Sequence, residues 1–344
     1  MTDVPPNAPV VSWLLPVKNG LPYLTETLAS IAAQTFQDFE LLVWLVPGTD
    51  GTRAELEHWI PLRIPGRIVG EGPLGVGASL HRLVAASEAE FCARIDADDI
   101  CEPDRLARQV AYLRTHPEIA LVGSRMRLIG TDGRPTGGFH ECPPDHVDIV
   151  NQFLVNNVVG HPSVIFRRVA VVAAGNYADT PVEDYDLWLR LACTHRLAAL
   201  PDPVVRYRVH QQSLTQLNTV AVVSVRAIKT LSAHSSALFG LSAVDVAALH
   251  ARERRFVLRY AVRTARHLAQ HGNLGFWTHL RRPSLIDMFR FFRRPYDLVS
   301  LFALALLDRR QGALPGAFAS LGALLSGGLR RRFARRTVPA APAK

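Results

Sequence analysis

The stretch RIDADDICEPDRL, residues 94–106, is where the fold can first be worked out, because it sets three aspartates between an apolar run and the start of a helix. Three like charges so close repel one another, and burial at a strand end is costly unless a cation or strong donors compensate. Asp99 and Asp104 could simply serve the following helix, where acidic side chains satisfy free N–H groups. That explanation leaves out Asp96 and Asp98, which at i and i+2 after a strand can face one cleft. Carboxylate oxygens suit Mg²⁺ or Mn²⁺, so the sequence predicts a divalent-metal site here.

Strands and helices are predicted to alternate on both sides of this stretch. Continuous apolar runs are typical of strands covered on both faces of a parallel sheet, and apolar residues at i, i+4 and i+7 indicate helices. The expected strands are 10–17, 39–46, 67–70, 89–95 and 120–129, and the expected helices are 21–35, 78–86 and one that starts near Pro103. This βαβ order predicts an α/β sandwich whose ligand site lies at the carboxyl ends of the strands, where the aspartates fall.

A second segment begins near Asp145 and is less regular. EDYDLWLRLACTH, residues 183–195, predicts a helix with Glu183 and Asp184 at its start, where they could merely cap it. PVVRYRVH, residues 203–210, predicts a strand that ends at His210. Beyond it the chain turns to basic, alanine-rich helices, which places a boundary near residues 212–222.

Composition limits the kind of protein this can be. With 344 residues, 48% of them hydrophobic, the chain is long enough for one large domain with an appendage or for two modest domains. Its four scattered cysteines form no C-x-x-C pair, which favours buried thiols in a reducing compartment such as the cytoplasm. The first ten residues, MTDVPPNAPV, contain no readable secretory signal.

Charge is distributed unevenly along the chain, although the net charge is +9. From Ala251 onward lie 19 of the 39 Lys and Arg residues but only 4 of the 30 Asp and Glu residues. Apolar blocks alternate there with arginine clusters, and residues 311–329 are uncharged but interrupted by proline and glycine. We expect helices that lie on an anionic membrane surface rather than cross it. The alternative is packing on the rest of the chain or on a second subunit, and no reader motif for nucleic acid is present.

Several segments, taken in order, resemble the family 2 glycosyltransferases, which have the GT-A fold. These segments are PVKN (16–19), QTFQDFELLV (34–43), ARIDADDICEPDRLARQVAYLRTHPEIALVGS (93–124), GHPSVIFRR (160–168), EDYDLWLRLA (183–192) and RYRVH (206–210). The resemblance implies a nucleotide-binding α/β/α sandwich over residues 10–212, followed by a mainly helical, basic region over 213–344. It also implies transfer of a sugar from a nucleoside-diphosphate sugar to an acceptor hydroxyl, usually with inversion and with a divalent metal, Mn²⁺ or Mg²⁺. The expected acceptor is a bacterial cell-surface glycan or a lipid-linked saccharide, at the inner face of the cell membrane.

The resemblance further implies roles for individual residues. Asp98 is the expected direct metal ligand, Asp96 lies on the ribose or metal side, and Asp99 could orient a water or the donor sugar. His210 is expected to approach the metal or the diphosphate. Asp184 is the first choice for the base that takes the acceptor proton, and Glu183 is the second.

Two more residues of these motifs have expected roles. Arg208 points to the same side of its strand as His210 and could hold phosphate, although a structural ion pair is an equal alternative. His161 is expected to shape the acceptor side of the pocket.

The chain departs from the family pattern at the end of its second strand. Leu45 and Val46 stand where the family usually has an aspartate pair, the first of which commonly contacts the nucleobase. Leucine cannot accept a hydrogen bond, so recognition of the base must be weaker, absent or moved to backbone groups near Pro16, Val17 and Asn19. The loop GPLGVG, residues 72–77, has the wrong spacing for a dinucleotide fingerprint and is expected to turn into a helix beside the donor site.

Two other functions compete with sugar transfer. The substitutions at the nucleobase position and the basic tail also suit a catalytically weak, membrane-associated assembly subunit with the same fold. A nucleotidyltransferase that makes sugar nucleotides shares the α/β layout, but it needs a basic phosphate-gripping loop near the first strand, and Lys18 alone is thin support for one.

Overall fold

The computed structural model describes residues 8–153, 157–210, 220–239 and 242–250 of the chain. It divides into two compact units, residues 1–238 and 239–344, and the central sheet lies in the first. The predicted domain boundary at residue 212 falls outside the described residues, as do the predicted membrane-surface helices beyond residue 250.

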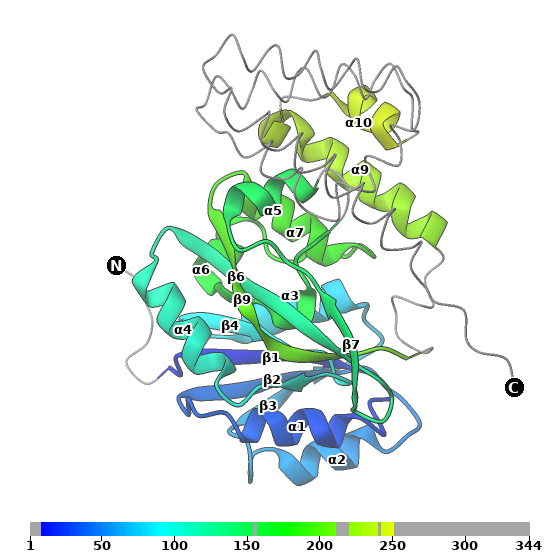
Figure 1. The fold of residues 1–344 in the computed structure, drawn as a ribbon. Helices are drawn as coiled ribbons and strands as arrows, with labels where there is room; N and C mark the ends of the chain where they lie inside the picture. The colour runs from blue at the N-terminus through cyan, green and yellow to red at the C-terminus, as the bar shows by residue number, and fades with distance from the viewer. Residues whose placement is uncertain (1–7, 154–156, 211–219, 240–241, 251–344) are drawn as a thin grey trace, which may run out of the picture. The chain divides into compact units, whose positions relative to one another are not determined.

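A mixed sheet forms the centre of the first unit (Figure 1). In the described part of the chain it has nine strands, in the order β3-β2-β1-β4-β8-β6-β9-β5, with β7 paired to β6. The strands are β1 Val11–Val17, β2 Phe39–Leu45, β3 Gly66–Glu71, β4 Phe91–Arg94, β5 Ile100–Cys101, β6 Ile119–Ile129, β7 Pro135–His140, β8 Ile165–Arg167 and β9 Arg196–Arg208. Strands β3, β2, β1 and β4 run parallel to one another, whereas β8 runs antiparallel to both β4 and β6.

Helices connect the strands of this sheet. They are α1 Leu24–Ala32, α2 Thr52–Trp59, α3 Val76–Ala86, α4 Arg105–Thr115, α5 His146–Phe153, α6 Arg168–Ala173 and α7 Glu183–Ala192, with a 3₁₀ helix, η1, at His161–Ser163. After the last strand come α9 Val220–Phe239 and α10 Ala243–His250, and α10 belongs to the second unit. In α1 the residues Leu24, Leu28 and Ile31 are fully buried, as the i, i+4, i+7 spacing predicts. The α/β sandwich predicted from the sequence is therefore confirmed.

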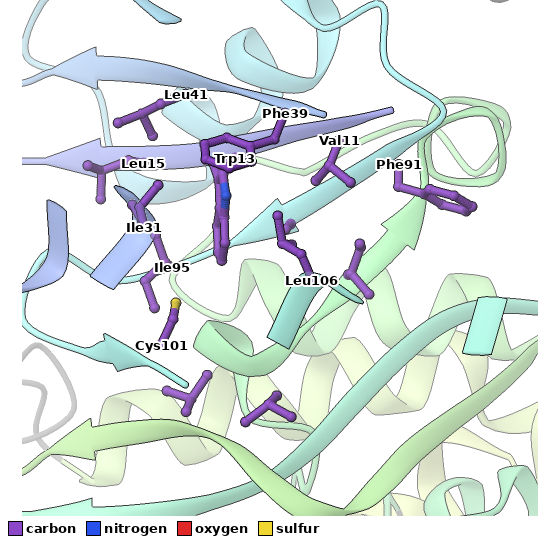
Figure 2. Close-up of a cluster of buried hydrophobic side chains, with 14 of the residues drawn as sticks. Val11, Trp13, Leu15, Ile31, Phe39, Leu41, Phe91, Ile95, Cys101 and Leu106 are labelled. Atoms are coloured by element: carbon purple, nitrogen blue, oxygen red, sulfur yellow. The ribbon is translucent and has the colours of Figure 1, made fainter. Parts of the chain in front are cut away.

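The core explains why the first strands are so apolar. Trp13 and Leu15 of β1 and Leu41 of β2 are completely buried, and Figure 2 shows them together with Ile31 of α1. A strand covered on both faces needs apolar residues at successive positions, and β1 is buried or half-buried throughout. The parallel register then brings the carboxyl ends of β1, β2 and β4 to one edge of the sheet.

The segment after residue 145 belongs to the same sheet rather than to a separate layer. Strand β9 pairs with β6 in parallel and with β5 antiparallel, so the sequence around Arg208 returns to the carboxyl end of β4. Helix α2 was not predicted from the sequence, because its segment TRAELEHW buries only Thr52 and Leu56 and has no continuous apolar face. Among the described residues, none of the helices is both long and apolar enough to cross a membrane.

Candidate active site

Three aspartates gather just beyond the end of β4. Oxygen atoms of Asp96, Asp98 and Asp99 all lie within 4.8 Å of one another. Asp99 is fully buried, whereas the side chains of Asp96 and Asp98 are 33% and 26% exposed. Burial raises the pKa of Asp96 and, with the charges of its two neighbours, raises that of Asp99 well above its ordinary value. The cluster therefore has the hard oxygen donors and the unbalanced negative charge that a divalent cation fits.

Each of these aspartates also touches a nitrogen of a basic residue. The guanidinium of Arg94 pairs with Asp96, and Nε2 of His210 lies 2.7 Å from Oδ2 of Asp98. The backbone N–H of Arg208 donates to Oδ1 of Asp99 over 2.8 Å, while Oδ2 of Asp99 is buried without a hydrogen-bond partner among the described residues. His210, predicted from the sequence as a third ligand, is thus brought to the aspartate cluster by the end of β9. A buried oxygen without a hydrogen-bond partner, such as Oδ2 of Asp99 among the described residues, is expected where a ligand completes the site.

Arg208 serves the fold instead of facing the site. Its side chain is fully buried and donates to the carbonyl oxygens of Asp98 at 2.8 Å and of Gly130 and Thr131 at 3.2 Å. It also pairs with Glu26 of α1 over 2.8 Å. The structure thus contains the ion pair that was one of the two alternatives for Arg208, and the phosphate contact stays a prediction. Arg208 fixes the backbone on which Asp98 stands.

The loop after β1 is tied to the loop after β2. Asn19 has φ of +50°, and its Oδ1 accepts from the N–H of Thr49 over 3.0 Å. The N–H groups of Gly20 and Leu21 donate to Thr52 and Asp50 over 2.8 Å. The side chain of Asn19 is therefore used to hold this loop. Pro16 and Val17 pair with β2, and Val17 is 3% exposed.

The position of the usual nucleobase contact is apolar in the structure. Leu45 is the last residue of β2, is 3% exposed and belongs to the hydrophobic core cluster. The N–H of Val46 donates to the carbonyl of Val17 over 2.9 Å. Neither side chain offers an acceptor, so the substitution read from the sequence is a real change in the chemistry of this edge.

A pair of carboxylates begins helix α7. Oδ2 of Asp184 accepts from Nδ2 of Asn157 over 2.7 Å, and its Oδ1 accepts from the N–H of Tyr185 over 2.6 Å. Oε1 of Glu183 lies 3.6 Å from Nδ1 of His161. Burial and then the charge of Asp184 raise the pKa of Glu183 to about 7, and burial raises that of Asp184 as well. Two neighbouring carboxyl groups that ionise with difficulty are the kind of group that can take a proton near neutral pH.

Glycines of the 72–77 loop let helix α3 approach this pair closely. Gly75 is the N-cap residue of α3, and a Cβ at Gly77 would clash with the carbonyl oxygen of Ala178 and lie 3.0 Å from Cβ of Glu183. The loop therefore does turn into a helix, as predicted. Glycine is required at position 77 because the backbone at Ala178, before α7, leaves no room for a Cβ.

Arg94 connects the two acidic groups, and its role was missed in the sequence. Its side chain is 5% exposed, it pairs with Asp96, and its positive charge also acts on Glu183 and Asp184, where it opposes the rise in their pKa. Its Nε has no hydrogen-bond partner among the described residues. A charged residue inside the apolar run AEFCARI was the signal available, because a buried arginine needs nearby negative charge.

The comparisons with known proteins agree with this geometry. The family model described as Glycosyl transferase family 2 matches residues 12–172. The amylovoran biosynthesis glycosyltransferase AmsE of Erwinia amylovora is 33% identical over 189 residues, which cover 54% of this chain and 70% of that protein. The O-antigen biosynthesis glycosyltransferase WbnJ of Escherichia coli is 29% identical over 220 residues, 62% of this chain and 84% of that one. Among solved structures, TarS 1–349 of S. aureus in complex with UDP-GlcNAc aligns with a TM-score of 0.52 at 15% identity over 92% of both chains, a likeness of fold.

Proposed function

Since this chain belongs to glycosyl transferase family 2, we propose that it transfers a sugar from a nucleoside-diphosphate sugar to an acceptor hydroxyl with inversion and with a divalent metal. The observation that carries the proposal is the placement of two acidic groups around one buried arginine. Arg94 pairs with Asp96 of the aspartate cluster and acts electrostatically on the Glu183–Asp184 pair. One group suits a metal with its diphosphate, and the other suits a proton acceptor.

The metal site in this proposal consists of Asp98, Asp96 and His210. These side chains fit the ion because they offer hard oxygens and one imidazole nitrogen, and because Oδ2 of the neighbouring Asp99 is buried without a partner among the described residues. A bound Mn²⁺ or Mg²⁺ would neutralise the negative charge that grows on the departing diphosphate. Arg208, through the carbonyl of Asp98, keeps the ligand loop in place.

The base in this proposal is Asp184, with Glu183 beside it as the second candidate. Asn157 and the N–H of Tyr185 hold the Asp184 carboxylate in one orientation and still leave it free lone pairs. The acceptor hydroxyl is a poor nucleophile at neutral pH, so a positioned carboxylate must take its proton as the oxygen attacks the anomeric carbon. Attack from the side opposite the leaving diphosphate inverts the configuration at that carbon.

The nucleobase must be recognised without a side-chain carboxylate at the end of β2. Leu45 is buried in the core, so backbone N–H and C=O groups along residues 16–19 are the proposed contacts. Because they are less selective than a fixed aspartate, the chain should discriminate between nucleotide bases less sharply than a relative that keeps the aspartate.

The proposed acceptor is a cell-surface glycan or a lipid-linked saccharide, reached from the cytoplasmic face of the membrane. The names of the two relatives assign them to amylovoran and O-antigen biosynthesis. The strongly basic sequence from Ala251 onward supports contact with an anionic membrane surface, and nucleic acid is not a proposed partner.

Calorimetric titration with UDP, GDP and dTDP tests this proposal, each with Mn²⁺ and with a chelator. We expect metal-dependent binding of at least one nucleotide by the wild type, loss of that binding in Asp98→Ala, and its retention in Asp104→Ala. Asp104 is a matched control, because it belongs to the same loop but its side chain is 55% exposed at the start of α4. If a folded wild type binds none of the three, a catalytically weak assembly subunit becomes the better account.

A further inference from the structure

A chain of three buried polar side chains leads into the site behind Glu183. The hydroxyl of Tyr177, between α6 and α7, lies 3.0 Å from Nε2 of His161 in η1, and Nδ1 of His161 lies 3.6 Å from Oε1 of Glu183. Tyr177 is 2% exposed, His161 is 8% exposed and the Glu183 side chain is 14% exposed. The ring of Trp188 packs edge-on against His161, with the centroids 5.6 Å apart, and limits how the imidazole can turn.

The proton positions in this chain follow from which groups are charged. Burial, with the positive charge of Arg94, lowers the pKa of His161 well below its ordinary value, so the imidazole is neutral. Burial raises the pKa of Tyr177 well above its ordinary value, so its hydroxyl keeps its proton. A neutral imidazole has one N–H and one lone pair. If Tyr177 donates to Nε2, the imidazole proton sits on Nδ1 and faces Glu183, whereas the opposite tautomer would point a lone pair at Glu183 once this carboxyl group is ionised.

We propose that Tyr177 and His161 are positioning residues that present the Nδ1–H of the imidazole to Glu183 and so set the pH range in which the carboxylate pair of α7 can take a proton. This inference rests on the proposed function, because it concerns the Glu183–Asp184 pair that was proposed there as the proton acceptor. The Tyr177 hydroxyl determines which imidazole nitrogen of His161 carries the proton, and this tautomer determines whether an N–H faces Glu183. At 3.6 Å from Oε1 this N–H is a polar neighbour of the carboxylate rather than a full hydrogen-bond donor, and the positive end of an N–H dipole directed at a carboxylate favours its charged form.

Other charged groups also face Glu183, and none of them duplicates this donor. Asp184 on the same helix and Asp96 beyond β4 raise its pKa by repulsion. Arg94 at the end of β4 lowers it, but pairs with Asp96 rather than with Glu183. Helix α3 contributes the uncharged Gly77 at this contact. The backbone N–H of Glu183 itself also lowers this pKa. The His161 side is therefore the one from which a neutral side-chain N–H can adjust Glu183.

The sign of the expected effect is fixed by this arrangement. Ionised Glu183 puts negative charge beside Asp184 and strengthens the pair as a proton acceptor, so turnover rises as pH rises through the ionisation of Glu183. Tyr177→Phe removes the group that selects the tautomer, so the acidic limb of the pH–rate profile should move to higher pH by about half a unit or more. Below the limb, that shift lowers turnover about threefold at fixed pH.

Amide replacements of His161 separate its two nitrogens. The amide nitrogen of His161→Asn takes the place of Nδ1 and can still direct an N–H at Glu183, whereas that of His161→Gln takes the place of Nε2 and cannot. We expect the acidic limb to stay near its wild-type position in His161→Asn and to move up in His161→Gln. Tyr112→Phe is the matched control, because it removes the hydroxyl of another tyrosine that packs on a histidine, with the ring centroids of Tyr112 in α4 and His116 lying 4.2 Å apart.

The deciding measurement pairs the pH–rate profile with ¹³C-carboxyl NMR titration of Glu183, assigned by Glu183→Gln. Upward shifts in Tyr177→Phe and His161→Gln, with His161→Asn and Tyr112→Phe unmoved, are the expected result. Unmoved titrations in folded Tyr177→Phe and His161→Gln would overturn the proposal. Because the NMR titration needs no substrate, it still decides this inference if the wild type consumes no donor, a result that would count against the proposed function alone.

Discussion

Replacing Glu183 with glutamine should stabilise the folded chain above neutral pH while it weakens sugar transfer. In the folded state, burial and Asp184 raise the pKa of Glu183 from an ordinary 4.5 to about 7. The folded state therefore binds the proton more tightly than the unfolded state, so the wild type loses stability as pH rises from about 4.5 through about 7. Above that range the loss reaches about 3 kcal/mol, and at pH 5 it is less than about 1 kcal/mol. Glutamine keeps the shape of the side chain and cannot ionise.

Urea unfolding at pH 8 and at pH 5 measures this effect through the midpoint of the transition that reports on α7. With a slope of about 3 kcal/mol/M, Glu183→Gln should unfold about 1 M later than the wild type at pH 8 and almost together with it at pH 5. Glu88→Gln, at an exposed position of the same unit, is the control and should change neither midpoint. The reasoning is refuted if Glu183→Gln is no more stable than the wild type at pH 8, or if any gain is the same at both pH values.

Three more substitutions, two of them with a matched variant, test how the site is held together. Arg94→Met should weaken metal-dependent nucleotide binding at least tenfold in calorimetry and lower the free energy of unfolding by about 2–3 kcal/mol, because the carboxylates lose their shared cation. Arg94→Lys should recover part of the binding and part of the stability. Gly77→Ala should lower stability by about 1–3 kcal/mol in thermal unfolding and reduce turnover, because its Cβ would clash with the Ala178 carbonyl. Gly75→Ala should be tolerated, since its Cβ would meet only a side-chain oxygen at 3.3 Å. Arg208→Lys should destabilise the fold by about 2–4 kcal/mol in urea unfolding, because a lysine cannot hold three carbonyl groups and Glu26 together; retention of full stability would contradict its structural role.

Motif order made the sheet and the acidic groups predictable from the sequence. Asp96 and Asp98 follow a continuous apolar run, and Glu183 and Asp184 precede an amphipathic one, so their places at a strand end and a helix start follow from local pattern alone. The partner of each residue was harder to predict, because a partner is chosen by the tertiary fold. Asn19 and Arg208 both carry groups suited to a nucleotide, yet the structure uses both side chains to bind neighbouring loops.

Arg94 and Tyr177 illustrate what local pattern does not contain. An arginine in a buried strand indicates nearby negative charge. Only the parallel register of β4 and the position of α7 in the fold show which carboxylates interact with Arg94. Tyr177 lies in no recognisable motif, and its contact with His161 joins residues 16 positions apart, with strand β8 and helix α6 between them. Burial of such contacts depends on packing that no window of sequence describes.

Release of nucleoside diphosphate from a panel of UDP-, GDP- and dTDP-sugars, with membrane lipid extract as acceptor and with Mn²⁺ or Mg²⁺, tests the central claim most directly. The account predicts that the wild type consumes at least one donor class, that Asp98→Ala and Asp184→Asn each lose at least about 100-fold of that rate, and that Asp104→Ala keeps it. Equal rates in the wild type and in folded Asp98→Ala and Asp184→Asn, or no consumption of any donor by the folded wild type, would contradict it.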